Sequence, residues 1–287
     1  MLLAEQFVDQ QHDLPAPSLD CDLDRAGPFE VATRHEEGHA QAHAQTFDGS
    51  DPDGAGAAAT VAATVAATTP PLSWRPYTQS DMSALTLLHA DEHLLVLDKP
   101  AGLLAVQGRG AAGACHLHGR VQAVYADAQV VHRLDMGTSG LLLFARGAVM
   151  QRELSRLFAE RQVSKRYTSV VEGDLVGEAG QIDAPLIADW PRRPRQQVDL
   201  LGGKAALTRW RVIARGPGCT RVELEPITGR THQLRVHLLH IGHPIRGDAL
   251  YAPLPLGAPR LLLHATRLCF THPATGLWLD LHCPAPF

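Results

Sequence analysis

The 287-residue chain has few cysteines and no paired cysteine motif. Its five cysteines are scattered, and none belongs to a C-x-x-C pair: Cys21, Cys115, Cys219, Cys269 and Cys283. This spacing indicates neither a zinc knuckle nor a disulfide framework, and it fits a reduced cytoplasm. The first residues, MLLAEQFVDQ, lack the basic segment and apolar run of a signal peptide, and no stretch approaches a membrane span. We therefore expect a cytoplasmic protein that does not bind membranes.

The chain also lacks the short motifs of several enzyme classes. Residues 74–287 contain 12 of the 16 histidines but no H-E-x-x-H pair of a zinc hydrolase. His232 and His237 are five residues apart and fall on different faces of a helix, so structural or RNA-facing histidines are favoured over metal ligands. T-S-G at 138–140 is no G-x-S-x-G elbow, and QGRGAAG (107–113) has the wrong spacing for a phosphate-binding loop. We expect no metal site and interpret 107–113 as a loop.

Lysine is scarce, and the charge is unevenly distributed. Only three of the 26 Lys+Arg residues are lysines, Lys99, Lys165 and Lys204. Residues 1–73 hold 2 Lys+Arg against 12 Asp+Glu, so residues 74–287 hold 24 against 18. Arginine suits bidentate phosphate recognition, but arginine bias also occurs in GC-rich genomes, and this feature alone leaves both explanations open.

Residues 1–73 have the composition of an unstructured extension. They are acidic, rich in Ala, Gly, Asp and Pro, and nearly free of aromatic residues. The segment GAGAAATVAATVAATTPP is of low complexity, and Pro70 and Pro71 would end any helix there. We predict that 1–73 is a disordered acidic extension, that order begins near Trp74, and that 74–287 forms one domain.

Residues 85–287 alternate between strand and helix patterns, with strands in the majority. Helix 148–162 has apolar residues at i, i+4, i+7 and i+8, starting from Met150. The other elements that we expect are strand–turn–strand 85–102, a buried strand 141–145, a strand 165–173, a hairpin 204–216/220–226, a helix 231–242 and a closing hairpin 260–284. Hairpin-like connections predict an α+β fold with a large, mainly antiparallel mixed sheet and flanking helices.

The stretch HRLDMGTSG (132–140) places a base, a cation and a carboxylate within four residues. An aspartate beside Gly, Thr and Ser is commonly an ordinary turn residue. Asp135, however, precedes an apolar run and lies two residues after Arg133, whose charge would favour the carboxylate form. Such a carboxylate can act as a nucleophile or as a base, and the residues alone leave these roles open.

Three further blocks accompany HRLD, in order along the chain. They are DEHLLVLDKPAGLLAV (91–106), KRY (165–167), and GRTHQLRVH (229–237) with GHPIRGD (242–248). With HRLD and T-S-G they resemble the blocks of the RluA-type pseudouridine synthases, over roughly residues 85–287. A chance match of four such blocks in order is negligible. The resemblance implies the pseudouridine synthase catalytic fold.

The resemblance implies isomerisation of uridine in RNA, without a cofactor: the N-glycosidic bond breaks, the base rotates, and a carbon–carbon bond forms through C5. Asp135 matches the catalytic aspartate, which could attack or deprotonate the sugar or add to the base. Tyr167 matches the active-site tyrosine, expected to stack on the uracil and to assist removal of the C5 proton; otherwise it is a half-buried strand aromatic. Arg230 matches the arginine that pairs with the aspartate.

The same resemblance gives Arg133 a role in base flipping. Enzymes that modify a stacked base must extrude it, and the arginine of HRLD is placed in the family to enter the vacated position. Leu234 resembles the apolar residue that flanks the flipped base, or else is a core residue of its helix. For His132 we expect packing or hydrogen bonding near the site rather than proton transfer.

The segment LIADWPRRPRQQV (186–198) bears on the RNA target. It resembles a D-W-P-x-R-P-[KR]-Q block of dual-specificity family members that lack an N-terminal S4 module, and 1–73 shows no basic helical pattern of such a module. This implies uridine 32 of the tRNA anticodon loop and uridine 746 of 23S rRNA as targets, with another uridine, such as tRNA uridine 65, as the alternative. Arg192, Arg193 and Arg195 would contact phosphates.

Two other functional classes are weaker. A non-catalytic RNA chaperone on the same fold is disfavoured by the presence of Asp135, Tyr167 and Arg230, and a metal-dependent hydrolase is less favoured still. We expect tRNA or 23S rRNA as partners and a monomer without an obligate protein partner. The acidic leader can be a tether, an autoinhibitory RNA mimic, or the product of a misassigned start codon, and we favour the last or a disordered tail.

Overall fold

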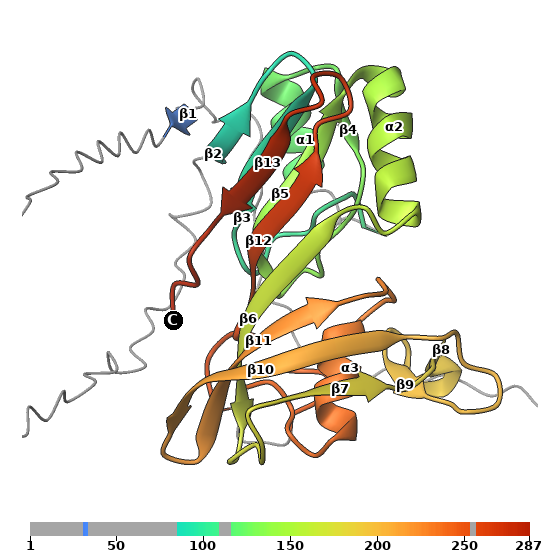
Figure 1. Ribbon diagram of the computed structural model, residues 1–287, viewed down its shortest axis with the longest axis vertical. Helices are drawn as coiled ribbons and strands as arrows, with labels where there is room; N and C mark the ends of the chain where they lie inside the picture. Colours follow the sequence, from blue (N-terminus) through green and yellow to red (C-terminus); the bar gives the residue numbers. More distant parts are fainter. Residues whose placement is uncertain (1–30, 34–84, 109–115, 253–256) are drawn as a thin grey trace, which may run out of the picture.

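The computed structural model describes residues 31–33, 85–108, 116–252 and 257–287. One long sheet runs through it, with α1 and α2 against one part and α3 against the other (Figure 1). Within 1–73, only Val31–Thr33 are described, and they form a strand where we predicted none, because they pair with the edge of the next strand. The rest of that prediction and the predicted start of order near Trp74 lie outside the described residues. Residues 109–115, which include most of the predicted loop 107–113, also lie outside them.

The elements alternate between short and long strands, with few helices. The strands are β1 (Val31–Thr33), β2 (Leu85–Ala90), β3 (Leu94–Lys99), β4 (Ala128–Val130), β5 (Ser139–Arg146), β6 (Ser164–Glu172), β7 (Ala179–Asp183), β8 (Leu186–Ala188), β9 (Gln196–Val198), β10 (Leu207–Gly216), β11 (Cys219–Pro226), β12 (Leu263–Thr271) and β13 (Trp278–His282). The helices are α1 (Leu117–Val124), α2 (Gly147–Ala159), α3 (Gln233–His240) and the 3₁₀ turn η4 (Trp190–Arg192).

The large sheet has the order β1-β2-β3-β5-β12-β6-β11-β10-β7, with β4 paired to β5 and β13 paired to β12. Two pairs, β1/β2 and β5/β12, are parallel, and the others are antiparallel. The strands β8 and β9 form a separate small hairpin. The α+β class with a mainly antiparallel mixed sheet is therefore confirmed.

The first half of the sheet, β2 to β5 with β12 and β13, is packed mostly by apolar residues. The strands β3 and β5 are almost continuously buried, as their unbroken apolar runs predict. The helix α2 buries Met150, Leu154 and Leu157, the face that the sequence pattern indicates. Together with α1 and β12, these elements enclose the larger hydrophobic cluster.

The second half, β6, β11, β10 and β7 with α3, has one solvated sheet face. Burial alternates along β10 and β11, so every second residue faces α3 and its neighbours. The helix α3 is buried from Gln233 to Leu238, including polar residues, although its pattern predicts only one apolar face. His237 shows why: Nδ1 bonds to Thr208 Oγ1 at 2.9 Å and Nε2 to the Ala184 carbonyl at 2.9 Å.

The predicted hairpins, long strands and two helices are confirmed, whereas α1 and the short strands β4, β7, β8 and β9 were not predicted. The helix α1 has a glycine in its first turn and is capped by His116, whose ring accepts a hydrogen bond from Gly119 N at 3.0 Å. This cap depends on a histidine, which is not a usual capping residue. In the part of the chain that is described, no helix has the length and apolar character of a membrane span.

Candidate active site

Asp135 lies in the loop between β4 and β5, and His132 anchors that loop. His132 Nε2 accepts a hydrogen bond from Leu143 N at 3.0 Å, and its ring stacks on Phe158 with centroids 4.6 Å apart. Burial lowers the pKa of His132 to about 3, so the imidazole is neutral and can accept this bond. The expectation that His132 packs and hydrogen-bonds near the site is confirmed.

A buried lysine ties the same loop to the K-P-A-G turn. The Lys99 side chain is 0% exposed, and its Nζ donates to the carbonyl oxygens of Pro100 and Leu103 at 2.7 Å. A third bond, 3.1 Å long, reaches the carbonyl oxygen of Met136. Burial lowers the pKa of Lys99 to about 7, while the charge of Asp135 acts in the opposite direction. Lys99 thus holds the backbone next to the carboxylate.

The end of the loop enters the seam between β5 and β12. Gly140 has φ +103°, and a side chain there would overlap the backbone of Ala265 on the neighbouring strand. Beside it, His264 Nδ1 lies 2.8 Å from Ser139 Oγ, and Nε2 lies 3.2 Å from the Cys283 carbonyl oxygen. The Asp135 loop therefore joins β5 at a position that is fixed by the close approach of two backbones.

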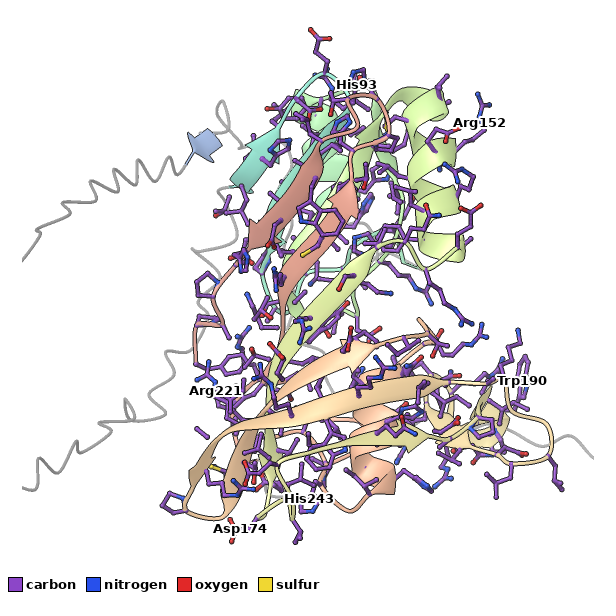
Figure 2. All side chains as sticks on the ribbon, viewed as in Figure 1. His93, Arg152, Asp174, Trp190, Arg221 and His243 are labelled. Carbon is purple, nitrogen blue, oxygen red and sulfur yellow. The ribbon has the colours of Figure 1, made fainter. Side chains whose placement is uncertain are left out.

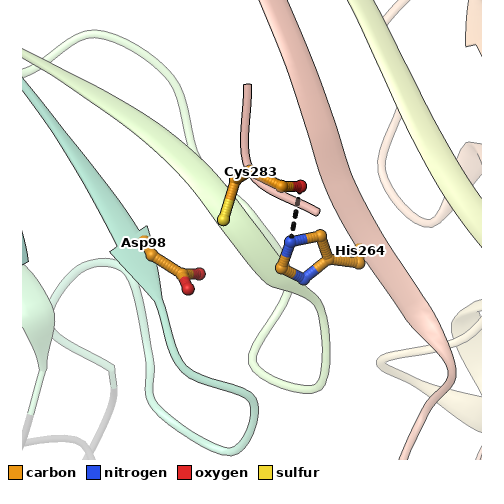
Figure 3. A group of neighbouring side chains, drawn as sticks. All are labelled: Asp98, His264 and Cys283. Atoms are coloured by element: carbon orange, nitrogen blue, oxygen red, sulfur yellow. Dashed lines mark hydrogen bonds between the residues drawn. The ribbon is translucent and has the colours of Figure 1, made fainter. Parts of the chain in front are cut away.

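The seam contains a group of Asp98, His264 and Cys283 (Figure 3). One possible ligand atom of each lies within 4.8 Å of the others. Both His264 nitrogens are already hydrogen-bonded, and the Cys283 thiol bonds to Asp98, whose pKa is raised by burial. A cation would have to displace these bonds, so we assign the group to holding β3, β5 and β12 together.

The carboxylate of Asp135 is paired with Arg235 of α3. Arg235 Nη1 donates to Asp135 Oδ2 at 3.1 Å, and its Nε and Nη2 donate to the two oxygens of Asp248 at 2.8 Å. Burial alone would lower the pKa of Arg235, but the bonds and charges of Asp248 and Asp135 raise it above its usual value. A charged guanidinium therefore lies between two carboxylates, with Asp248 1% exposed.

The predicted pairing of Arg230 with Asp135 is wrong. Arg230 Nε donates to the Ala205 carbonyl at 3.0 Å, and its backbone N–H donates to Gln233 Oε1 at 2.9 Å. The physical reason is the start of α3 at Gln233: Arg230 precedes the helix, while Arg235 projects from its first turn. Both arginines belong to GRTHQLRVH, so the motif contained the right residue, but not the information about which one faces the carboxylate.

These side chains line a cleft of about 510 Å³ between the two halves of the sheet. Tyr167 of β6 and the buried Leu234 of α3 contribute to its walls, and exposed Arg133 donates to Thr231 Oγ1 at 3.5 Å. Burial and the charge of Asp135 raise the pKa of Tyr167, so its phenol stays protonated. The cleft brings together five residues that the sequence singled out: Arg133, Asp135, Tyr167, Arg230 and Leu234.

The arginines of the D-W-P block are not among the residues that line this cleft: Arg192, Arg193 and Arg195. Arg192 is exposed and pairs with the buried Asp189 at 2.7 Å. Arg193 lies over the exposed ring of Trp190, 4.7 Å from its centroid. Figure 2 shows Trp190 at the far tip of the second half. These cations form a separate positive surface on η4 and the segment after it.

Two residues at the site, His232 and Tyr251, were given no role by the sequence. His232 Nε2 is 3.8 Å from Asp135 Oδ2, and its Nδ1 is 2.7 Å from Tyr251 Oη. Tyr251 lies under the guanidinium of Arg195, at 5.2 Å. His232 is part of GRTHQLRVH and Tyr251 follows GHPIRGD closely, which is a signal, but only tertiary contacts reveal what they touch. Lys99 and Asp248 were missed for the same reason.

The chain matches the family model described as RNA pseudouridylate synthase over residues 93–240. It is 47% identical over 214 residues to the dual-specificity RNA pseudouridine synthase RluA of Pasteurella multocida, covering 74% of this chain and 98% of that protein. With the protein of the same name from Escherichia coli K12 it shares 47% over 206 residues, 71% of this chain and 94% of that protein.

Two solved structures are similar in fold. Human RNA pseudouridylate synthase domain containing 1 has a TM-score of 0.63 at 26% identity, covering 74% of this chain and 87% of that one. Human RNA pseudouridylate synthase domain containing 4 has a TM-score of 0.57 at 28% identity, covering 70% and 88%. Both similarities extend over most of the described residues.

Proposed function

The chain belongs to the RNA pseudouridylate synthase family and is an RNA pseudouridine synthase, and from that premise we propose that it isomerises uridine 32 of the tRNA anticodon loop and uridine 746 of 23S rRNA, with Asp135 as the catalytic carboxylate. The observation that carries the catalytic assignment is the Asp135–Arg235 pair beside Tyr167 in one cleft. The dual-specificity names of the two bacterial relatives and the D-W-P block support the targets.

In the proposed reaction, the bond between N1 of uracil and C1′ of ribose breaks, and the base turns within the cleft. A new bond then joins C5 to C1′, C5 loses its proton, and N1 gains one, so the atoms of substrate and product are the same. Asp135 supplies the carboxylate that attacks or deprotonates the sugar, or adds to the base. No cofactor takes part in these steps.

Arg235 supports Asp135 in this scheme. Its guanidinium donates two hydrogen bonds to Asp248 and so keeps its place when the carboxylate charge of Asp135 changes. Arg230 lines the cleft without contacting Asp135, which suggests a contact with RNA rather than with the carboxylate.

Tyr167 and Leu234 are proposed to hold the flipped uracil. A protonated phenol is a poor base, so the raised pKa of Tyr167 favours stacking over removal of the C5 proton by this residue. Arg133 is exposed beside the cleft and bonds only weakly to Thr231, so it is free to enter the stack that the uridine leaves.

The surface of Arg192, Arg193 and Arg195 is proposed to contact phosphates of the anticodon loop or of the rRNA loop. Single-stranded loops are the usual targets of sequence-specific RNA recognition, and cations position them without reading sequence. The protein is expected to act as a monomer in the cytoplasm, on tRNA and 23S rRNA.

The test is pseudouridine mapping on an anticodon stem-loop and on a 23S rRNA fragment. Each RNA is treated with wild-type protein, with Asp135→Asn, and with Asp174→Asn as the matched control. Asp174 is exposed at the end of the molecule away from the cleft (Figure 2). We expect conversion by wild type and by Asp174→Asn, and at least a 10³-fold slower reaction with Asp135→Asn.

The outcomes distinguish the assignment of Asp135 as the catalytic carboxylate from the assignment of the two RNA targets. Wild-type rates with Asp135→Asn would contradict the catalytic assignment. Conversion of neither RNA by folded wild-type protein would contradict the two targets. Mapping of total bacterial RNA, including tRNA uridine 65, would then identify the alternative site.

A further inference from the structure

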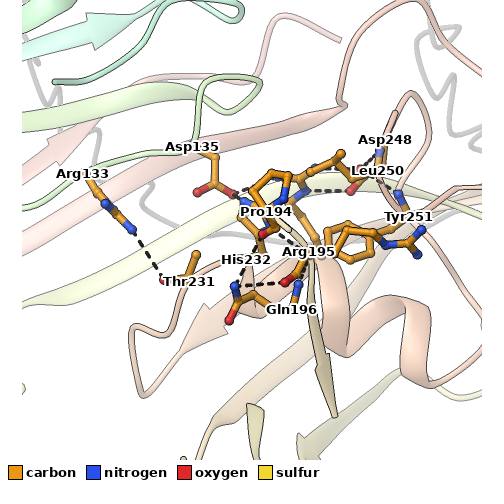
Figure 4. Close-up of polar contacts among 11 residues, drawn as sticks. Arg133, Asp135, Pro194, Arg195, Gln196, Thr231, His232, Asp248, Leu250 and Tyr251 are labelled. Atoms are coloured by element: carbon orange, nitrogen blue, oxygen red, sulfur yellow. Dashed lines mark hydrogen bonds and ion pairs between the residues drawn. The ribbon is translucent and has the colours of Figure 1, made fainter. Parts of the chain in front are cut away.

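A line of polar contacts connects β9 to the catalytic carboxylate. The backbone N–H of Gln196 donates to Tyr251 Oη at 2.7 Å, and the same oxygen lies 2.7 Å from His232 Nδ1. His232 Nε2, on the other side of the ring, lies 3.8 Å from Asp135 Oδ2. Figure 4 shows these residues converging beside the start of α3. None of them is exposed.

The hydrogen-bond donors and acceptors in this line favour one placement of the protons on Tyr251 and His232. The Gln196 N–H occupies Tyr251 Oη as a donor, so the hydroxyl proton of Tyr251 points elsewhere. Among the contacts of the described residues, His232 Nδ1 is the acceptor within reach of that proton. Where Nδ1 accepts this proton, a neutral His232 carries its own proton on Nε2, the nitrogen nearest to Asp135.

The surroundings of His232 favour the neutral ring. The charged groups that face it are Asp135 on its loop, Arg235 and Asp248 next to it, and Arg133 at the cleft. Burial is the largest influence and lowers the pKa of His232, and the positive charges of Arg235 and Arg133 act in the same direction. The two carboxylates oppose them but do not reverse the direction.

The backbone also aims the ring. His232 has φ 53° and ψ 19°, a left-handed conformation that is uncommon for a residue with a side chain and costs on the order of 1 kcal/mol. Its side chain is 11% exposed and meets the Tyr251 ring edge-on, with centroids 5.6 Å apart. The surrounding contacts therefore hold both the backbone and the ring of His232.

We propose that Tyr251 is a positioning residue that fixes His232 as the tautomer protonated on Nε2, so that this N–H points at Asp135 Oδ2. This rests on the proposed role of Asp135. With Arg235 also bonded to Oδ2, Asp135 Oδ1 is the oxygen that accepts no hydrogen bond from the described residues, and it is the one that meets the ribose or the base. The 3.8 Å gap closes when RNA binds, since catalytic hydrogen bonds are commonly long before substrate is present.

The direct test is the tautomer of His232 in the full-length protein. Protein labelled with ¹⁵N-histidine is studied by NMR at neutral pH, and the His232 signals are identified by their loss in His232→Gln. We expect a protonated Nε2 and an unprotonated Nδ1 in wild type. Tyr251→Phe keeps the aromatic ring under the guanidinium groups of Arg235 and Arg195 but removes the hydroxyl. In this variant we expect a mixture of the two tautomers.

Kinetics provide the second test, through a rescue. Loss of one orienting hydrogen bond predicts that Tyr251→Phe lowers kcat about tenfold, with less than a twofold change in KM for RNA. The Gln side chain of His232→Gln carries an N–H near the place of Nε2 that needs no tautomer. In that background, Tyr251→Phe is therefore expected to change kcat less than twofold.

Three results would overturn the proposal: a proton on Nδ1 in wild type, an unchanged tautomer in Tyr251→Phe, or the same fold-loss of kcat in both backgrounds. The wild-type NMR measurement keeps the test valid even where a variant does not fold. It also needs no turnover, so it stands apart from the mapping experiment with Asp135→Asn, whose failure would contradict the proposed function instead.

Discussion

The half of the sheet that carries Asp135 and the half that carries Arg235 differ in how far buried polar bonds supplement their apolar packing. In the first, α1 and α2 cover β3 and β5 with a continuous apolar cluster. In the second, α3 packs Leu234 and Leu238 into a smaller apolar cluster. It is also joined to β10 by buried polar side chains, as in the bond from Gln233 Nε2 to Thr208 Oγ1 at 3.0 Å. Apolar packing absorbs small changes, whereas a buried hydrogen bond leaves an unpaired group when one partner is removed. We infer that removing a buried polar partner around Arg235 costs more stability than a small apolar change in the cluster around β3 and β5.

Among the substitutions that test this comparison, we expect the largest effect at Arg235. Arg235→Gln would leave the buried Asp248 carboxylate without its partner, so we expect a loss of about 3–5 kcal/mol in the free energy of unfolding. We also expect at least a 100-fold loss of kcat, because Asp135 loses its cation. Urea denaturation and single-turnover assays measure the two losses.

Arg230→Gln is the matched control, since Arg230 belongs to the same motif but bonds to a carbonyl at the cleft. It should cost about 1 kcal/mol of stability or less and should leave most of kcat at saturating RNA, whereas KM for RNA should rise because Arg230 is proposed to contact RNA. Equal losses in the two variants would contradict the assignment of Arg235 as the partner of Asp135.

In the first half, we expect substitutions to be most damaging at the seam between β5 and β12, where the two backbones approach closely. Gly140→Ala would place a methyl group in the backbone of Ala265, at a positive φ, so we expect a loss of about 3 kcal/mol or a failure to fold. Gly276→Ala has a similar φ of +72° but open space around it, and should cost about 1 kcal/mol. Thermal melting of both variants measures the difference; equal melting temperatures would refute close approach as the reason for Gly140.

Acid should weaken the same seam through His264. Burial lowers the pKa of His264 to about 4, with Arg260 acting in the same direction, from an ordinary value of 6.5. Between these values the unfolded state binds more protons, so the stability contributed is complete above pH 6.5 and is lost as the pH falls toward 4. At pH 4.5 the loss from this residue is about 2–3 kcal/mol.

Urea denaturation at pH 7.5 and 4.5 tests this expectation. The His264→Gln variant should be less stable than wild type at neutral pH but should lose less stability on acidification. A loss as steep as that of wild type would show that other groups carry the acid sensitivity.

The smallest effect is expected on the arginine surface of the second half, outside both cores. Arg193→Gln should raise the Kd for an anticodon stem-loop about fivefold and lower the slope of log K against log salt by about 0.7–0.9. It should leave kcat at saturating RNA unchanged. Arg152→Gln, exposed on α2 in the first half (Figure 2), is the control, and an equal effect there would argue against a defined RNA surface.

Much of the fold follows from local pattern. The strands β3 and β5 are long apolar runs and α2 has a clear helical period, so each is visible in its own residues. The short strands β8 and β9 have three residues each, too few to show a period. The parallel pairing of β5 with β12 has no local signal, because more than 100 residues separate its partners Ser139 and His264.

The site residues likewise include some that the local sequence predicts and some that it does not. Asp135, Tyr167 and Arg133 come from motif blocks, and the cleft brings them together. The choice between Arg230 and Arg235 depends on where α3 begins, within two or three residues, which is the least predictable property of a helix.

The position of β12 has a consequence for how the protein is made. This strand lies between β5 and β6, so the halves bearing Asp135 and Arg235 become neighbours in one sheet only after residues 263–271 have inserted between them. During synthesis, the edge of β6 and the Ser139–Gly140 end of β5 therefore lack their sheet partner until residues 263–271 are available. A nascent chain that does not yet contain this strand holds every residue lining the cleft except Leu263, but its two halves are not yet joined, so we expect it to be unable to modify RNA.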